Sequence, residues 1–116
     1  MAFLDNPVRL TAAGGIDLVN PPLASLIKGA GLMAVKLVYE AGFFHPMHSH
    51  AEHESMGIVL TGHMRMVIGG ETVDLRAGDM WHHPVGVPHS AETLEYTEAV
   101  EIHTPLRPDL LAIFGA

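Results

Sequence analysis

Short runs of β-favouring residues, separated by Gly or Pro, dominate the chain from Leu32 onward. Such runs, bounded by turn-forming residues at close spacing, predict strands rather than helices. The Gly69-Gly70 pair predicts a tight hairpin, because glycine takes positive φ at both turn positions without a steric penalty. The runs are LMAVKLVY (32–39), SMGIVL (55–60), HMRMVI (63–68), ETVDL (71–75), DMWHH (79–83) and LEYTEAVEIH (94–103). Many short strands bury their edges by closing into a barrel or a sandwich, so the predicted fold class is all-β.

The length of 116 residues predicts one domain with one hydrophobic core. Residues 1–30 contain several Gly and Pro and no sustained periodicity, so we expect an irregular N-terminal arm with at most one short strand. Residues 31–116 are expected to form the barrel with a short C-terminal tail. After Pro108, the sequence DLLAIFGA suits one helical turn or a docked coil.

Composition limits the possible partners. Six Lys and Arg against thirteen Asp and Glu give a net charge of -7, which repels the phosphates of nucleic acids. No stretch approaches the apolar length of a membrane span, and no signal-peptide pattern opens the chain, so a cytoplasmic protein without membrane contact is expected. The chain has no Cys, so any bound metal must be held by His and carboxylate side chains.

Histidine is the unusual component, with nine residues in all and four of them between His45 and His53. His48 and His50 are two apart, so in a strand their imidazoles project from the same face. Glu54 follows, and His89 comes after the sharp turn predicted for the sequence PVGVP. Imidazole nitrogens with a carboxylate suit a divalent transition metal such as Fe, Mn, Ni, Co or Zn.

These residues resemble the two conserved motifs of the cupin superfamily. The matching segments are Gly42-FFHPM-His48-Ser-His50-AEH-Glu54 followed by Gly62, and Gly78-DMWHH-Pro84-Val-Gly86-VP-His89. The resemblance implies a small jelly-roll β-barrel, also described as a double-stranded β-helix, with one divalent transition metal per chain. It implies His48, His50, Glu54 and His89 as the metal ligands. Counting back from Gly62 instead puts the fourth ligand position on Ser55, and Glu54, Ser55 and water all remain candidates for it.

The C-terminal tail resembles that of the pectin-degradation cupins, which open unsaturated monouronates to linear keto sugars. The segment Glu101-Ile-His103-Thr-Pro105-Leu-Arg107-Pro-Asp109-Leu is similar to their D-V-F-S-P-P-R-E-D-F ending. The resemblance implies catalytic positions at Glu101, His103 and Arg107. Glu101 and His103 share a strand face, as acid–base work inside a barrel requires. Arg107 suits bidentate binding of a substrate carboxylate.

Three further histidines lie near the motifs. His45 precedes the first motif's histidines and is expected either near the metal or in a loop at the barrel mouth. His82 and His83 are adjacent on one predicted strand, so one of them must face the barrel interior.

Three functions fit these residues. The first is a metal-dependent enzyme of the isomerase or ring-opening type, acting on a small carboxylate or sugar acid. The second is an iron-dependent dioxygenase with a three-His site, which the Ser55 alignment favours. The third is a barrel that binds a small ligand without catalysis. We also expect a homodimer, because cupins of this size commonly pair through edge strands or N-terminal arms.

Overall fold

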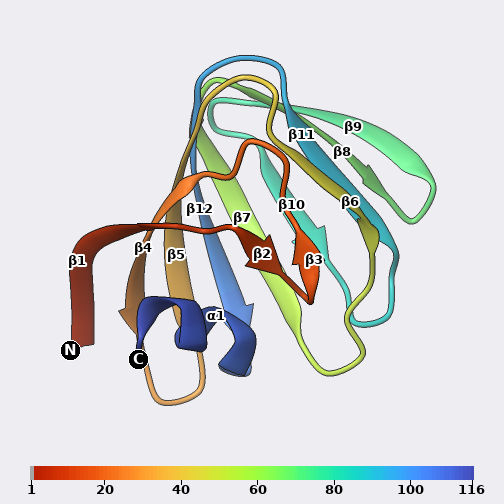
Figure 1. The fold of residues 1–116 in the computed structure, drawn as a ribbon. Coiled ribbons are helices and arrows are strands. Elements are labelled where there is room, and N and C mark those ends of the chain that lie inside the picture. Colours follow the sequence, from red (N-terminus) through yellow and green to blue (C-terminus); the bar gives the residue numbers. More distant parts are fainter. Residues whose placement is uncertain (1) are drawn as a thin grey trace.

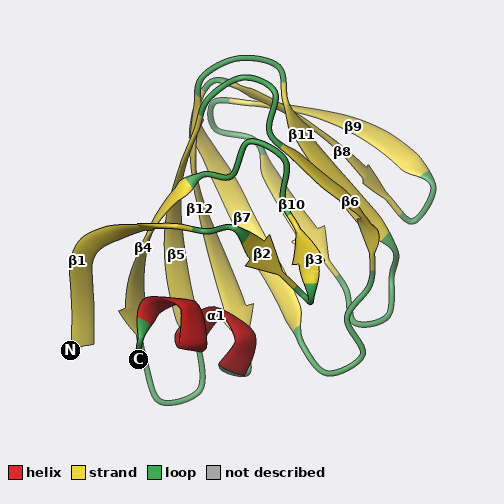
Figure 2. Cartoon of the chain, in the orientation of Figure 1, coloured by secondary structure: helices red, strands yellow, loops and turns green. Residues whose placement is uncertain are grey.

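The computed structural model describes residues 2–116, with side chains from Pro7 onward. Strands make up most of the chain, and one short helix follows them (Figures 1 and 2). The strands are β1 (Ala2–Arg9), β2 (Ala12–Ala13), β3 (Ile16–Asp17), β4 (Leu23–Lys28), β5 (Met33–Tyr39), β6 (Phe44–His48), β7 (Glu54–Thr61), β8 (His63–Ile68), β9 (Glu71–Arg76), β10 (Met80–His83), β11 (His89–Thr93) and β12 (Thr97–Thr104). The helix is α1 (Pro108–Phe114). The predicted all-β class is confirmed.

Two antiparallel sheets form the walls of the barrel. The larger has the order β1-β4-β5-β12-β7-β10, and the smaller has the order β6-β11-β8-β9. β2 and β3 form a separate two-stranded hairpin. Apolar side chains from both sheets meet between them; the largest fully buried ones are Leu26, Met33, Val35, Val59, Met64 and Leu75, and Leu110 of α1 is also fully buried. Within residues 2–116, no helix has the length and apolar character needed to cross a membrane.

The alternation of side chains along β12 brings polar groups into this core. Thr97, Ala99 and His103 are buried, and the side chain of Glu101, on the same face, is largely buried. β12 pairs with β5 on one side and β7 on the other, so its inward face lies in the middle of the larger sheet. The expectation that Glu101 and His103 share a face is confirmed.

The glycine-rich turn between β8 and β9 has the predicted conformation. Ile68 pairs with Glu71, and Gly69 and Gly70 both have positive φ, 56° and 85°. These values suit the two-residue hairpin turn that matches the twist of antiparallel strands.

The N-terminal region differs from its prediction. Residues 1–30 were expected to be irregular with at most one short strand, but β1, β2, β3 and β4 all lie within residues 2–28. β1 pairs with β4, and β4 pairs with β5, so both belong to the larger sheet. β1 and β4 form because they pair with strands that are distant in the sequence. The Gly and Pro content of residues 1–30 does not indicate that pairing. The domain boundary at residue 30 stays a prediction.

A close approach between Gly57 and Trp81 fixes how β7 and β10 pack. The two residues are paired across the strands, and a Cβ at Gly57 would overlap the indole ring of Trp81. Gly57 is therefore required by packing.

Replacing Gly57 by Ala should force Trp81 from its position and lower the free energy of unfolding by about 1–3 kcal/mol, the usual range for overpacking a core. Gly31 is a matched control, because its Cβ would meet nothing within 4 Å. Gly31→Ala should stay within about 0.5 kcal/mol of the parent. Urea denaturation followed by the fluorescence of Trp81, the one Trp in the sequence, measures both. Equal losses in the two variants would contradict the packing argument.

Candidate functional site

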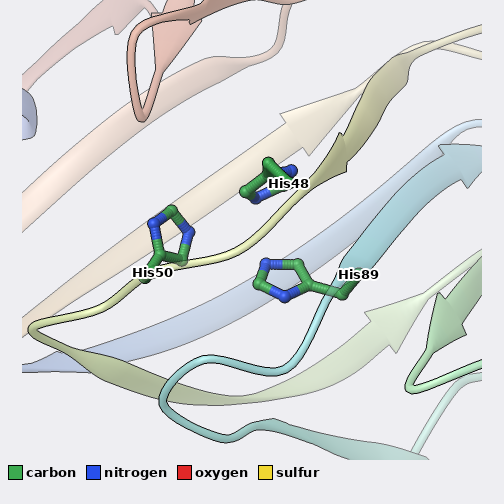
Figure 3. A group of neighbouring side chains, drawn as sticks. All are labelled: His48, His50 and His89. Atoms are coloured by element: carbon green, nitrogen blue, oxygen red, sulfur yellow. The ribbon is translucent and has the colours of Figure 1, made fainter.

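Three histidines, on or next to two paired strands, meet inside the barrel (Figure 3). His48 ends β6, His50 follows it, and His89 begins β11. β6 and β11 are antiparallel partners, and their register places His89 opposite His48. One ring nitrogen from each imidazole lies within 4.8 Å of the others. Strand pairing therefore joins two histidines, His48 and His89, that are 41 positions apart in the sequence.

Backbone carbonyls fix the tautomer of two of these imidazoles, so that Nε2 is free to bind a metal. Nδ1 of His48 lies 2.7 Å from the carbonyl oxygen of Pro46, and Nδ1 of His89 lies 3.0 Å from that of Val87. A carbonyl only accepts, so each Nδ1 carries the proton and each Nε2 keeps its lone pair. Burial lowers the pKa of both imidazoles. For His50, burial and the charge of Arg107 lower the pKa to about 3. Three neutral imidazoles with converging nitrogens fit a divalent transition metal.

The structure does not bring Glu54 to these histidines. The Glu54 carboxylate accepts a hydrogen bond from Nε2 of His82 at 2.9 Å, and both side chains are substantially exposed. The next residue, Ser55, is buried and points into the barrel. The first motif can be aligned with either Glu54 or Ser55 at the fourth ligand position. The observed strand register agrees with the second alignment, because it turns Ser55 inward.

Ser55 belongs to a polar cluster around the Glu101 carboxylate. Its hydroxyl donates to Oε2 of Glu101 at 3.0 Å, and Nε1 of Trp81 donates to the same oxygen at 3.3 Å. Nε2 of His103 lies 3.2 Å from Oε1, and Nδ1 of His83 lies 3.6 Å from Oε2. Burial raises the pKa of Glu101, but the attraction and hydrogen bonding of His103, the charge of His83 and the Ser55 hydroxyl outweigh it. The net pKa is well below the usual value, so Glu101 is an anion.

His83 faces the barrel interior and His82 faces outward. One of these two adjacent histidines was expected to face inward, and it is His83. The His83 ring stacks on His89 with centroids 3.7 Å apart, and burial lowers its pKa to about 4. Trp81, the other inward side chain of β10, was missed as a partner of Glu101. The same period-two alternation that turns His83 inward also turns Trp81 inward, so the signal was present in the sequence.

Two more imidazoles pack against the group of three. His45 stacks on His48 with centroids 3.7 Å apart, and His53 lies 4.2 Å from His50. Burial lowers the pKa of both, to about 3 for His45. Nε2 of each is buried without a hydrogen-bond partner among the described residues. His45 is therefore close to the group of three histidines, one of the two positions expected for it.

Arg107 lies between β12 and α1 and is only 4% exposed. Its Nε and Nη2 donate to the carboxylate oxygens of Asp109 at 3.2 and 2.7 Å. Arg107 lines the same cavity of about 60 Å³ as the three histidines and Glu101. This cavity is therefore lined by one carboxylate, one guanidinium and six imidazoles, the group of three together with those of His45, His83 and His103. Apart from the Ser55 hydroxyl, its remaining wall is largely apolar, formed by Leu10, Ala13, Leu18, Pro22, Val35, Leu37, Tyr39, Phe43, Met64, Met66, Trp81, Ala91 and Leu110.

The fold and the cavity define a small antiparallel β-barrel with a cluster of histidines inside it. The model of the cupin domain family matches residues 35–104 of the chain. The chain therefore belongs to the cupin domain family, and the predicted jelly-roll class and cupin membership are confirmed. No curated protein matches the sequence.

Solved structures agree with this assignment. The structure of KdgF from Halomonas sp. is 25% identical with a TM-score of 0.70, and the match covers 96% of this chain and 92% of that one. An RmlC-like cupin from Shewanella frigidimarina is 22% identical with a TM-score of 0.73, over 90% of this chain and 97% of that one. A predicted oxalate decarboxylase from Thermotoga maritima is 17% identical with a TM-score of 0.75, over 91% and 100% of the two chains. At these identities the last two establish the fold alone.

The lowered histidine pKa values predict that acid destabilises the metal-free protein. In the unfolded chain an imidazole takes up a proton as the pH falls below 6.5, whereas His45 in the folded barrel does so only near pH 3. The unfolded state binds more protons between these values, so the free energy of unfolding falls as the pH is lowered from 6.5 towards 3. His45→Asn removes one such group and should make the fall shallower.

Urea denaturation of metal-free protein at several pH values measures this effect. Glu101 acts in the same direction at lower pH, because its folded-state pKa is also below the unfolded value. A free energy of unfolding that stays constant or rises on acidification would contradict the assignment of these imidazoles as buried and neutral.

Proposed function

We propose that this cupin is a metal-dependent enzyme that isomerises or ring-opens a small carboxylate or sugar acid. The observation that supports this most directly is one cavity that contains three neutral imidazoles, the ionised Glu101 and the buried Arg107. The tail's resemblance to the cupins that open unsaturated monouronates suggests the substrate class, and the similarity to KdgF from Halomonas sp. agrees with it.

The proposed cofactor is one divalent ion per chain, Fe, Mn, Ni, Co or Zn, held by His48, His50 and His89. When bound, such an ion supplies Lewis-acid polarisation of a carbonyl or hydroxyl oxygen. Glu54 is the fourth ligand that the motif implies, but its hydrogen bond to His82 argues against that role. The fourth position then belongs to water or substrate.

The protein residues have separate proposed roles. Glu101 is ionised, so it accepts the proton that leaves the substrate and returns it to the product. His103, with Nε2 3.2 Å from Glu101, stabilises that carboxylate and holds it in position for proton transfer. Arg107 binds the substrate carboxylate, because a guanidinium fork matches the two oxygens of a carboxylate.

The assembly and location are also proposals. We propose a homodimer that contacts a second copy through the outer face of the larger sheet. This face exposes the large apolar side chains Met56, Leu60, Met80 and Ile102. We also propose that the protein acts in the cytoplasm.

Metal content tests the site. Protein purified without a tag or chelator should contain about one transition metal per chain, the number that one three-His site accepts. The double variant His48→Ala, His89→Ala should contain none, as measured by inductively coupled plasma mass spectrometry. A parent that stays metal-free after reconstitution would instead favour a barrel that binds a small ligand without catalysis.

Glu101→Gln tests the catalytic carboxylate. This variant should lose turnover of unsaturated monouronates by at least about 100-fold, the usual contribution of an acid–base residue, while its metal content is unchanged. Glu98→Gln is the matched control, because Glu98 lies on the same strand with its carboxylate 3.8 Å from Lys36. Retained activity in Glu101→Gln would exclude Glu101 as the acid–base group.

A second candidate function is a three-His iron dioxygenase. The outward position of Glu54 and the hydrogen bond from Ser55 to Glu101 favour it, because three imidazoles alone leave several positions of an iron open for substrate and oxygen. Iron as the native metal, with oxygen uptake on a diketone, thiol or catechol, would support this function. Uronate ring opening without oxygen uptake would favour the first.

A further inference from the structure

The hairpin of β2 and β3 is too short to be stable by itself. Its two strands pair through only two residue pairs, joined by Gly14 and Gly15 at the tip. Isolated two-stranded hairpins are marginal in water even when longer. Contacts with the rest of the protein must therefore hold it in place.

The inner side of this hairpin is part of the wall of the site. Gly14 lies against the His50 imidazole, since a Cβ there would be 3.1 Å from Cε1 of that ring and 3.9 Å from Nη2 of Arg107. Ala13, next to it, is buried and lines the cavity. The hairpin tip thus covers the side of the cavity where His50 and Arg107 lie.

Different bonds hold the base and the tip. At the base, the backbone N–H of Leu18 donates to the carbonyl of Thr11 at 2.9 Å. At the tip, the N–H of Gly14 donates to Oδ2 of Asp109 at 2.9 Å. The base is therefore closed by the backbone, whereas the tip is bound by a carboxylate from the first turn of α1.

The Asp109 carboxylate also accepts two hydrogen bonds from Arg107, at 3.2 and 2.7 Å. Burial raises its pKa, but the hydrogen bonds from Arg107 and from the Gly14 N–H outweigh this and lower the pKa to about 2. Asp109 is therefore charged at neutral pH, and charge-assisted hydrogen bonds of this kind are the stronger ones in proteins.

We propose that Asp109 is a positioning residue that ties the β2–β3 hairpin to Arg107 and thereby limits entry of metal and ligand to the site. This inference rests on the proposed metal site. Because Arg107 is also the proposed binding group for the substrate carboxylate, one side chain holds both the cover of the site and its anion-binding group in position.

The kinetics of metal uptake test this role. Metal-free parent, Asp109→Ala and Asp109→Asn are mixed with Co²⁺ in a stopped-flow spectrometer, and the bound ion is then removed with a chelator. Both rates should rise roughly tenfold or more in Asp109→Ala, the factor that corresponds to losing a charge-assisted hydrogen bond. Asp109→Asn, which keeps one acceptor oxygen for Gly14, should be intermediate. The amount of Co²⁺ bound should be the same in all three.

Asp17→Asn is the matched control, because Asp17 is an exposed acidic residue on the same hairpin. It removes the same charge and should leave both rates unchanged. Circular dichroism and Trp81 fluorescence show whether each variant is folded. If folded Asp109→Ala binds Co²⁺ normally and at the same rates as the parent, the proposed role of Asp109 is wrong. The proposed metal site would not be affected by that result.

A parent that binds no Co²⁺ would refute the proposed metal site instead. The hairpin is then tested in metal-free protein by the rate at which diethyl pyrocarbonate modifies His50, followed by peptide mass spectrometry. Faster modification in Asp109→Ala than in the parent and Asp17→Asn supports the cover, and equal rates in all three reject it.

Discussion

A carboxylate buried in the middle of the larger sheet is the constraint on which the rest of the site depends. β12 turns Glu101 into the core, where an unpaired charge costs far more than a hydrogen bond returns. Nearby strands therefore supply polar partners. Ser55 from β7 and Trp81 from β10 donate hydrogen bonds, and His103 of β12 itself lies 3.2 Å from the carboxylate. The His83 imidazole from β10 lies 3.6 Å away. These contacts keep Glu101 ionised in spite of its burial, and they account for the inward positions of Ser55, His83 and His103.

The same constraint shapes the histidine group. The inward position at the start of β7 is the one from which a side chain faces the cavity, and Ser55 occupies it. Its short side chain gives its hydrogen bond to Glu101, while Glu54 turns outward to His82. Among residues 2–116, the group that fits a metal consists of three imidazoles. The register of β7 thus gives the buried Glu101 a hydrogen bond from Ser55. The same register turns Glu54 away, so the first motif contributes only His48 and His50 to the group that fits a metal.

Local patterns in the sequence predicted the parts of this site that depend on local geometry. The Gly69-Gly70 hairpin and the shared face of Glu101 and His103 follow from turn chemistry and the period of a strand. The resemblance to the cupin motifs implied that His89 would join His48, which lies 41 positions earlier in the chain. By contrast, β1 and β4 exist because they pair with each other and with β5, and nothing within residues 1–30 indicates those partners.

The choice between Glu54 and Ser55 was open for a related reason. A shift of one residue along a strand reverses the face of every side chain, and the motif spacing allowed both registers. The pairing of His83 with Ser55 and of Trp81 with Gly57 decides it, because only in this register does the indole lie over a residue without a Cβ. The packing of one aromatic side chain therefore settles which residue at the start of β7 faces the cavity.

Burial of so many imidazoles prepares the site for a metal at a cost to the metal-free barrel. The side-chain nitrogens His45 Nε2, His53 Nε2, His83 Nε2 and His103 Nδ1 are buried without hydrogen-bond partners among the described residues, and each such group costs about 1–3 kcal/mol. None of these four nitrogens belongs to the proposed ligands. The tautomers of two proposed ligands, His48 and His89, are already fixed by backbone carbonyls, so these rings need little reorganisation to bind an ion. An imidazole binds a metal only when it is neutral, so an ion bound by the proposed ligands His48, His50 and His89 would stabilise the folded barrel, and acid would oppose both its binding and folding.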